Sequence, residues 1–96
     1  MDSIASLRQE IDQVHKELHA LLVRRRELTM AVWKIKQEQG LPFYNQEREE
    51  QILESFVNLD PAQVAQDPQF AELLKGTMNS ILREYEKYLK SKYPTK

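Results

Sequence analysis

Residues 4–39 read IASLRQEIDQVHKELHALLVRRRELTMAVWKIKQEQ, and apolar side chains recur along them at alternating steps of three and four residues. This spacing is typical of an α-helix that buries one face. We call the apolar residues that follow it the heptad seam: Ile4, Leu7, Ile11, Val14, Leu18, Leu21, Leu28, Val32 and Ile35. No proline or glycine precedes Gly40 and Pro42, so the sequence predicts one uninterrupted helix over about 4–39.

Arg25 interrupts the heptad seam, because it occupies a position between Leu21 and Leu28 where the spacing requires an apolar residue. A guanidinium stays charged in proteins, and burying it without partners costs several kcal/mol. Two interpretations follow from the residues alone. Either the Arg25 side chain extends outward to water, or it meets an anion.

The composition limits the classes of protein that this chain can be. Its 96 residues suit a single domain, and 30% charged residues with only two glycines favour helices. The formal net charge of −1 provides no basic field to hold a nucleic acid, and zero cysteines exclude disulfides and thiolate metal sites. With no signal peptide and no apolar run of the roughly 20 residues that a membrane span needs, we expect a cytoplasmic protein.

The length of the first helix predicts self-association. A helix of 36 residues extends about 54 Å at about 1.5 Å per residue, whereas a compact 100-residue domain has a radius of gyration near 13 Å. The helix exceeds any globule that the chain can form alone, so a second copy must cover its seam. We therefore predict an intertwined homodimer, to which a second apolar strip, Leu22, Met30 and Trp33, could contribute.

The rest of the chain predicts two further helices and no strand. Asn45 is a suitable N-cap for a helix over about 46–58, and Asp67-Pro68 is a suitable start for a helix over about 68–90, with a frayed tail at 91–96. The inward residues of the last helix are expected to be Phe70, Leu73, Leu74, Ile81, Tyr85, Tyr88 and Leu89. Between these helices, Asp60-Pro61 starts a short helical turn at most. The prediction is an all-α domain over 1–96 with one very long, one short and one long helix.

Polar residues recur at helical spacing beside the apolar faces. Arg25, Thr29, Val32 and Lys36 share one edge of the first helix, with the two cations about 16 Å apart. The other polar residues that could converge with them in a bundle core are Arg48, Glu49, Ser80 and Glu84. Such a site suits a small molecule with carboxylates, because arginine binds a carboxylate through two parallel hydrogen bonds.

Other chemistries receive less support. Ser80 has no histidine at helical spacing and there is no cysteine, which argues against nucleophilic catalysis. His15 and His19 have i, i+4 spacing, but no acidic residue lies in register to complete a metal site, so we expect solvated histidines and no metal. Arg8 lies beside the seam, where a surface ion pair with Asp12 is the simple explanation.

The chain resembles the all-α chorismate mutases over nearly its whole length. The resemblance is carried by Leu7-Arg8-Gln9-Glu10-Ile11-Asp12, Leu21-Leu22, Arg25-Arg26-Glu27-Leu28, Val32, Lys36, Gly40, Pro42, Arg48-Glu49, Ile52-Leu53 and Ser80. It implies a domain-swapped homodimer that converts chorismate to prephenate, for phenylalanine and tyrosine biosynthesis, with no cofactor or metal. The reaction is an intramolecular Claisen rearrangement, so catalysis is positioning plus electrostatics.

The resemblance also implies roles for individual residues. Arg25 and Arg48 look like carboxylate clamps, and Arg8 resembles the arginine that reaches the site of the other protomer. Lys36 looks like the donor to the ether oxygen. The remaining substrate contacts implied are Glu49 and Asn45 near the ring hydroxyl, Ser80 near a carboxylate, and Val32 and Ile81 as apolar walls.

Two positions depart from the commonest bacterial pattern of the family, which has aspartate at Asn45 and glutamine at Glu84. A glutamate donates a hydrogen bond only when it is protonated, whereas glutamine donates at any pH. We therefore expect activity that falls as the pH rises, and we expect Glu84→Gln to flatten the profile.

Three other functions compete with the mutase. Isochorismate–pyruvate lyase and aminodeoxychorismate mutase use a similar clamp on the same scaffold, and the loop at 41–44 does not separate them. A non-catalytic helical interaction module explains the long helix but not Arg25 in its seam. The chain could also work in a complex with another enzyme of the shikimate pathway.

Overall fold

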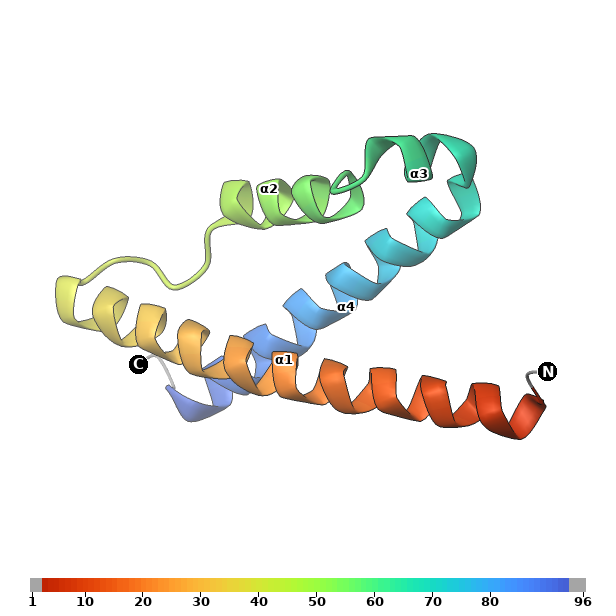
Figure 1. Ribbon diagram of the computed structural model, residues 1–96. Helices are drawn as coiled ribbons and strands as arrows, with labels where there is room; N and C mark the ends of the chain where they lie inside the picture. Colours follow the sequence, from red (N-terminus) through yellow and green to blue (C-terminus); the bar gives the residue numbers. More distant parts are fainter. Residues whose placement is uncertain (1–2, 94–96) are drawn as a thin grey trace. The chain divides into compact units, whose positions relative to one another are not determined.

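The computed structural model describes residues 3–93, and every regular element in that range is a helix (Figure 1). In chain order the helices are α1 (Ile4–Gln39), α2 (Gln46–Val57), α3 (Pro61–Gln66) and α4 (Pro68–Lys92). The all-α prediction is confirmed, with four helices rather than three. Helix α1 forms one unit of the chain, and the residues from Gly40 onward form the other.

Helix α1 has the predicted bounds. The hydroxyl of Ser3 accepts a hydrogen bond from the backbone N–H of Ser6 at 3.1 Å, which is the geometry of an N-cap. The helix stops at Gly40, whose φ of 68° is a left-handed conformation that glycine adopts without strain. All nine seam residues are exposed in the single chain, from 45% for Leu7 to 69% for Ile4.

Helices α2 and α4 begin where the capping residues predict. The Asn45 side chain accepts a hydrogen bond from the backbone N–H of Arg48, and the Asp67 side chain accepts one from Phe70. Helix α2 ends at Val57, one residue before the predicted end. The Asn58 side chain then donates to the carbonyl of Glu54 at 2.9 Å, which satisfies a terminal backbone acceptor.

Two predictions about the helices were wrong. The short turn after Asp60 is a six-residue helix, α3, because the Asp60 carboxylate accepts from the Gln63 N–H at 3.3 Å and Pro61 takes the first helical position. Helix α4 continues through residues 91 and 92, where Lys90 and Lys92 favour the negative helix end and the Lys92 ammonium lies 5.8 Å from the Tyr88 ring centroid. Residues 94–96 of the predicted tail lie outside the described range.

Helix α4 carries the buried residues of the second unit, and both α2 and α3 pack against it. The buried side chains are Met78, Leu82 and Leu89, of which only Leu89 was predicted. Leu73 was predicted to point inward and is 58% exposed. It lies about 140° around the helix from Met78 and shares its exposed edge with Thr77, Ser80 and Glu84.

Candidate active site

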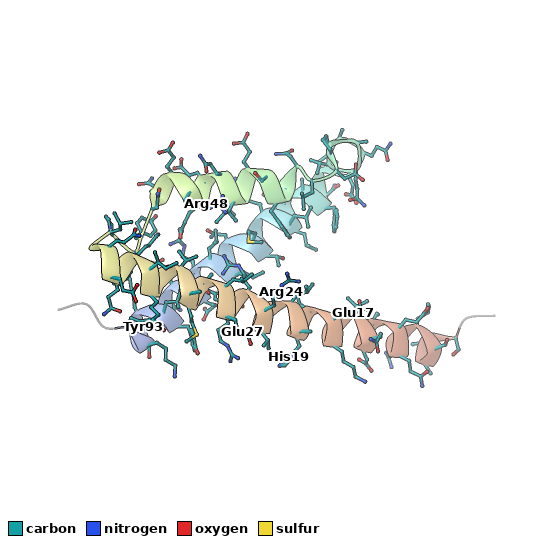
Figure 2. All side chains as sticks on the ribbon, turned by 60° about the vertical axis from the view of Figure 1, so that its left-hand side comes forward. Glu17, His19, Arg24, Glu27, Arg48 and Tyr93 are labelled. Carbon is teal, nitrogen blue, oxygen red and sulfur yellow. The ribbon has the colours of Figure 1, made fainter. Side chains whose placement is uncertain are left out.

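One edge of α1 carries three of the predicted site residues, Arg25, Val32 and Lys36. Arg25 and Lys36 are eleven residues apart, which is about three helical turns, so their side chains leave the same face. Thr29 lies between them, and its hydroxyl donates to the carbonyls of Arg25 at 2.8 Å and Arg26 at 3.0 Å. Arg25 and Lys36 are half-buried. Arg24, Glu27 and His19, which lie off this edge, are exposed (Figure 2).

Arg8 lies far from this edge of its own helix. It precedes Arg25 by 17 residues, which places the two residues about 26 Å apart along the axis and about 100° apart around it. The predicted surface pair is wrong, because the described residues contain no ion pair between Arg8 and Asp12. The Arg8 side chain is exposed in the single chain.

The first turn of α2 presents Asn45, Arg48 and Glu49 together. The Asn45 Oδ1 atom accepts from the Arg48 backbone N–H at 3.0 Å, and its backbone carbonyl accepts from the Glu49 N–H at 3.1 Å. The capping bond uses the amide oxygen of Asn45, so its amide NH₂ group is the part that can donate to a ligand. Arg48 projects from this turn as an exposed guanidinium (Figure 2).

Glu49 binds an arginine that the sequence did not single out. The Arg83 Nη2 atom lies 2.9 Å from Glu49 Oε1, and this ion pair joins the first turn of α2 to α4. The Arg83 Nη1 atom lies 2.9 Å from Glu86 Oε2, and Glu86 Oε1 lies 2.9 Å from the Lys90 ammonium. The i, i+3 and i, i+4 pairs are readable from the sequence, but the bond to Glu49 spans 34 positions and has no local signal.

Two members of this network, Arg83 and Glu86, have pKa values shifted toward their ionised forms by their neighbours. The Glu49 carboxylate raises the pKa of Arg83 above its ordinary value, with Glu86 and a hydrogen bond to Tyr44 acting in the same direction. A hydrogen bond from Lys90 lowers the pKa of Glu86, and the charges of Lys90 and Arg83 add to the effect. Glu86 thus stays a carboxylate that fixes one side of the Arg83 guanidinium.

Helix α4 contributes Ser80, Ile81 and Glu84 from the turn that includes Arg83. Ser80 and Glu84 lie on the exposed edge, and Ile81 is half-buried beside them. The Glu84 carboxylate lies 3.3 Å from the Lys87 ammonium, and both side chains are mostly exposed. The Glu49–Arg83 contact therefore brings five predicted residues of this unit, Asn45, Arg48, Glu49, Ser80 and Glu84, to neighbouring turns of two packed helices.

Each unit by itself carries groups that can contact an anion with hydroxyl groups: cations on α1, and a cation, an amide, a hydroxyl and carboxylates on α2 and α4. Guanidinium and ammonium groups bind carboxylates, while an amide, a hydroxyl and carboxylates supply hydrogen bonds to neutral oxygens. Within residues 3–93, no three histidine or acidic side chains gather where they could hold a metal ion. The same range contains no helix that is both long and apolar enough to cross a membrane.

Comparisons with known proteins identify the family. Residues 7–87 match the family model described as chorismate mutase type II. A T-protein from Haemophilus influenzae is 33% identical over 85 residues, which are 88% of this chain and 21% of that protein. A bifunctional chorismate mutase/prephenate dehydratase from Aquifex aeolicus is 35% identical over 60 residues, 62% of this chain and 17% of that protein. No solved structure gives a significant match.

The matches differ in how much of each protein they cover. The chain spans only about a fifth of the length of the two curated relatives. The family model, in contrast, extends from before Arg8 to beyond Glu84, so it includes every predicted site residue. The chain belongs to the chorismate mutase type II family.

Proposed function

We propose that this protein is a chorismate mutase, an isomerase that rearranges chorismate to prephenate in phenylalanine and tyrosine biosynthesis. The observation that carries the proposal is the family match over residues 7–87, which covers all the predicted site residues. The chemistry of those residues agrees with it. The substrate has two carboxylates, and the predicted site residues include guanidinium and ammonium groups, which bind carboxylates.

The proposed mechanism uses positioning and electrostatics. Arg25 and Arg48 bind the two carboxylates and hold the substrate in the folded conformation that brings its reacting carbons together. Lys36 and Glu84 are the proposed hydrogen-bond donors to the ether oxygen, where negative charge grows as the carbon–oxygen bond breaks. Glu49 and Asn45 bind the ring hydroxyl, Ser80 supports a carboxylate, and Val32 and Ile81 bound the pocket.

The proposed enzyme is a homodimer with composite sites. The exposed heptad seam of α1 is an apolar face that a second copy would cover. Arg8 and Arg25 of one helix are about 26 Å apart, far more than the length of one small dicarboxylate. Arg8 can therefore contribute to catalysis only at a site whose Arg25 comes from the other copy.

The proposed product, prephenate, needs an enzyme that uses it. The name of the Aquifex relative joins chorismate mutase to prephenate dehydratase, an activity that consumes prephenate. We propose that the present chain also supplies prephenate to a following enzyme of the pathway, in the cytoplasm.

An isochorismate–pyruvate lyase or an aminodeoxychorismate mutase remains the second candidate, because the same cations would bind either substrate.

The test is to follow the loss of chorismate with purified protein and to separate the products by chromatography. Formation of prephenate is the expected result. Turnover of isochorismate or the amino analogue, without turnover of chorismate, would move the chain to a sister activity. No turnover of any of the three would contradict the enzyme proposal and favour a helical interaction module.

A further inference from the structure

The ion pair with Arg83 fixes the orientation of the Glu49 carboxylate, which is a hydrogen-bond acceptor. Arg83 uses Nη2 for Glu49 and Nη1 for Glu86, each at 2.9 Å, so one planar guanidinium is fixed at two corners. Glu86 is held in turn by Lys90 at 2.9 Å. The Arg83 bond takes only Oε1 of Glu49, and a carboxylate has a second oxygen that can accept from a ligand hydroxyl.

A carboxylate in the site of a dianionic substrate creates an electrostatic problem. Like charges at a few ångströms repel, and a partly buried site screens the repulsion less than bulk water does. The Glu49 side chain is only 16% exposed, so water screens its charge poorly. The Arg83 guanidinium lies beside Glu49 and offsets its negative charge, while the second oxygen of Glu49 can still accept a hydrogen bond.

We propose that Arg83 is a positioning residue for the substrate, acting through Glu49. It orients the Glu49 carboxylate toward the ring hydroxyl, and it neutralises a charge that would otherwise repel the substrate carboxylates. The inference rests on the proposed function, because it takes Glu49 as the acceptor for the ring hydroxyl. Arg83 itself need not touch the substrate.

The competing explanation is a purely structural one, in which Arg83 only joins α2 to α4. Both explanations predict some loss of stability when Arg83 is replaced. They differ in what they predict for substrate binding. If Arg83 neutralises Glu49, then Arg83→Gln weakens substrate binding by electrostatic repulsion, and the effect disappears when Glu49 loses its charge. A purely structural contact gives no reason for such a repulsion. Removal of an interaction made equally in ground and transition states raises KM and leaves kcat nearly unchanged.

The experiment measures kcat, KM and thermal unfolding for Arg83→Gln, Arg83→Lys, Glu49→Gln and the double variant Arg83→Gln/Glu49→Gln. We expect Arg83→Gln to raise KM about tenfold with kcat within about threefold, and we expect added salt to shrink the penalty. Arg83→Lys should recover part of the loss, because it keeps the charge and loses the two-cornered geometry. The double variant should be no worse than Glu49→Gln, because no repulsive charge is left to neutralise.

The control is Lys75→Gln, which removes an exposed cation from the same helix and should leave KM unchanged. Penalties of Arg83→Gln and Glu49→Gln that simply add, or a loss of thermal stability with an unchanged KM, would overturn the inference and leave the mutase proposal intact. Absence of chorismate turnover by the wild-type protein would overturn the proposed function, and this inference with it.

Discussion

The side-chain oxygen of Asn45 accepts a hydrogen bond from the backbone N–H of Arg48 at 3.0 Å, so one predicted site residue caps the helix that carries the next. Asn45→Ala removes the acceptor and should lower the free energy of unfolding by about 1 kcal/mol. Asn45→Asp keeps an acceptor at the same place and should retain both stability and activity. Urea unfolding measures the free energies of unfolding of both variants. If the two variants lost the same stability, the hydrogen bond to the side-chain oxygen at position 45 would not be its source.

Arg25→Leu should raise stability and lower activity. Leucine completes the heptad seam with an apolar residue, whereas the loss of a charged hydrogen-bonding partner for a carboxylate should reduce kcat/KM about 100-fold or more. Thermal unfolding and a chorismate assay measure the two effects. Arg24→Leu is the matched control, because Arg24 is the adjacent exposed arginine and lies off the seam. A stabilised Arg25→Leu variant with full activity would remove Arg25 from the site.

Variants of Arg8 and Arg25 should complement each other if the sites are composite. Arg8→Gln and Arg25→Gln homodimers should each be inactive. In a heterodimer of the two, one site combines an intact Arg25 with the intact Arg8 of the other copy. Mixing equal amounts after unfolding should therefore restore about a quarter of the wild-type activity with random pairing. If Arg8 served its own copy, every site in the mixture would lack one arginine and no activity would return.

Leu18→Glu should separate the copies, because it places a charge in the middle of the exposed seam. Sedimentation velocity should show a smaller species, and chorismate turnover should be lost. His19→Glu adds the same charge at the next residue, which is exposed and off the seam (Figure 2), and should leave the mass unchanged. A monomeric wild-type protein would contradict the role given to the seam.

Acid should weaken the fold through Glu86. Its pKa is lowered in the folded chain, chiefly by the hydrogen bond from Lys90, so the unfolded state binds more protons as the pH falls through the glutamate range. The stabilisation is present above the ordinary glutamate pKa and is lost below it. Unfolding free energies between about pH 6 and pH 3 should fall less steeply for Glu86→Gln than for the wild type. Parallel curves would exclude Glu86 from the acid response.

The proposed role of Glu84 is to donate a hydrogen bond to the ether oxygen, and this role can be tested with an amide in its place. Glu84→Gln always carries a donor and should keep or raise kcat, whereas Glu84→Ala carries none and should lower kcat. In the single chain the Glu84 carboxylate lies 3.3 Å from the Lys87 ammonium, so Lys87→Gln tests whether that pair affects kcat. A kcat of Glu84→Ala equal to that of the wild type would refute the role of Glu84.

The features that local sequence patterns control were predicted well. The seam spacing and Gly40 defined both ends of α1, and Asn45 and Asp67 marked the starts of α2 and α4, because caps and turns depend on a few adjacent residues. The errors concern packing between helices. Leu73 and Met78 both suit a helix face, and only the position of α2 and α3 on α4 decides which is covered.

The candidate site shows the same division. Individual residues on α1, α2 and α4 were chosen from spacing and from the family resemblance, and the family match now includes all of them. The Arg83 contact was missed because its partner lies 34 positions away, and no periodicity connects residues that meet only through tertiary packing. The convergence of Arg25 and Lys36 with the residues of α2 and α4 stays a prediction.

If a second copy covers the exposed seam of α1, the stability of the fold depends on protein concentration. A helix about 54 Å long gains little stability from its own backbone in water, so most of its stability must come from whatever covers its apolar face. If that cover is another copy, folding and association are one second-order reaction, and dilution alone should unfold the protein. The amount of enzyme in the cell would then determine not only how many sites exist but also what fraction of the chains is folded.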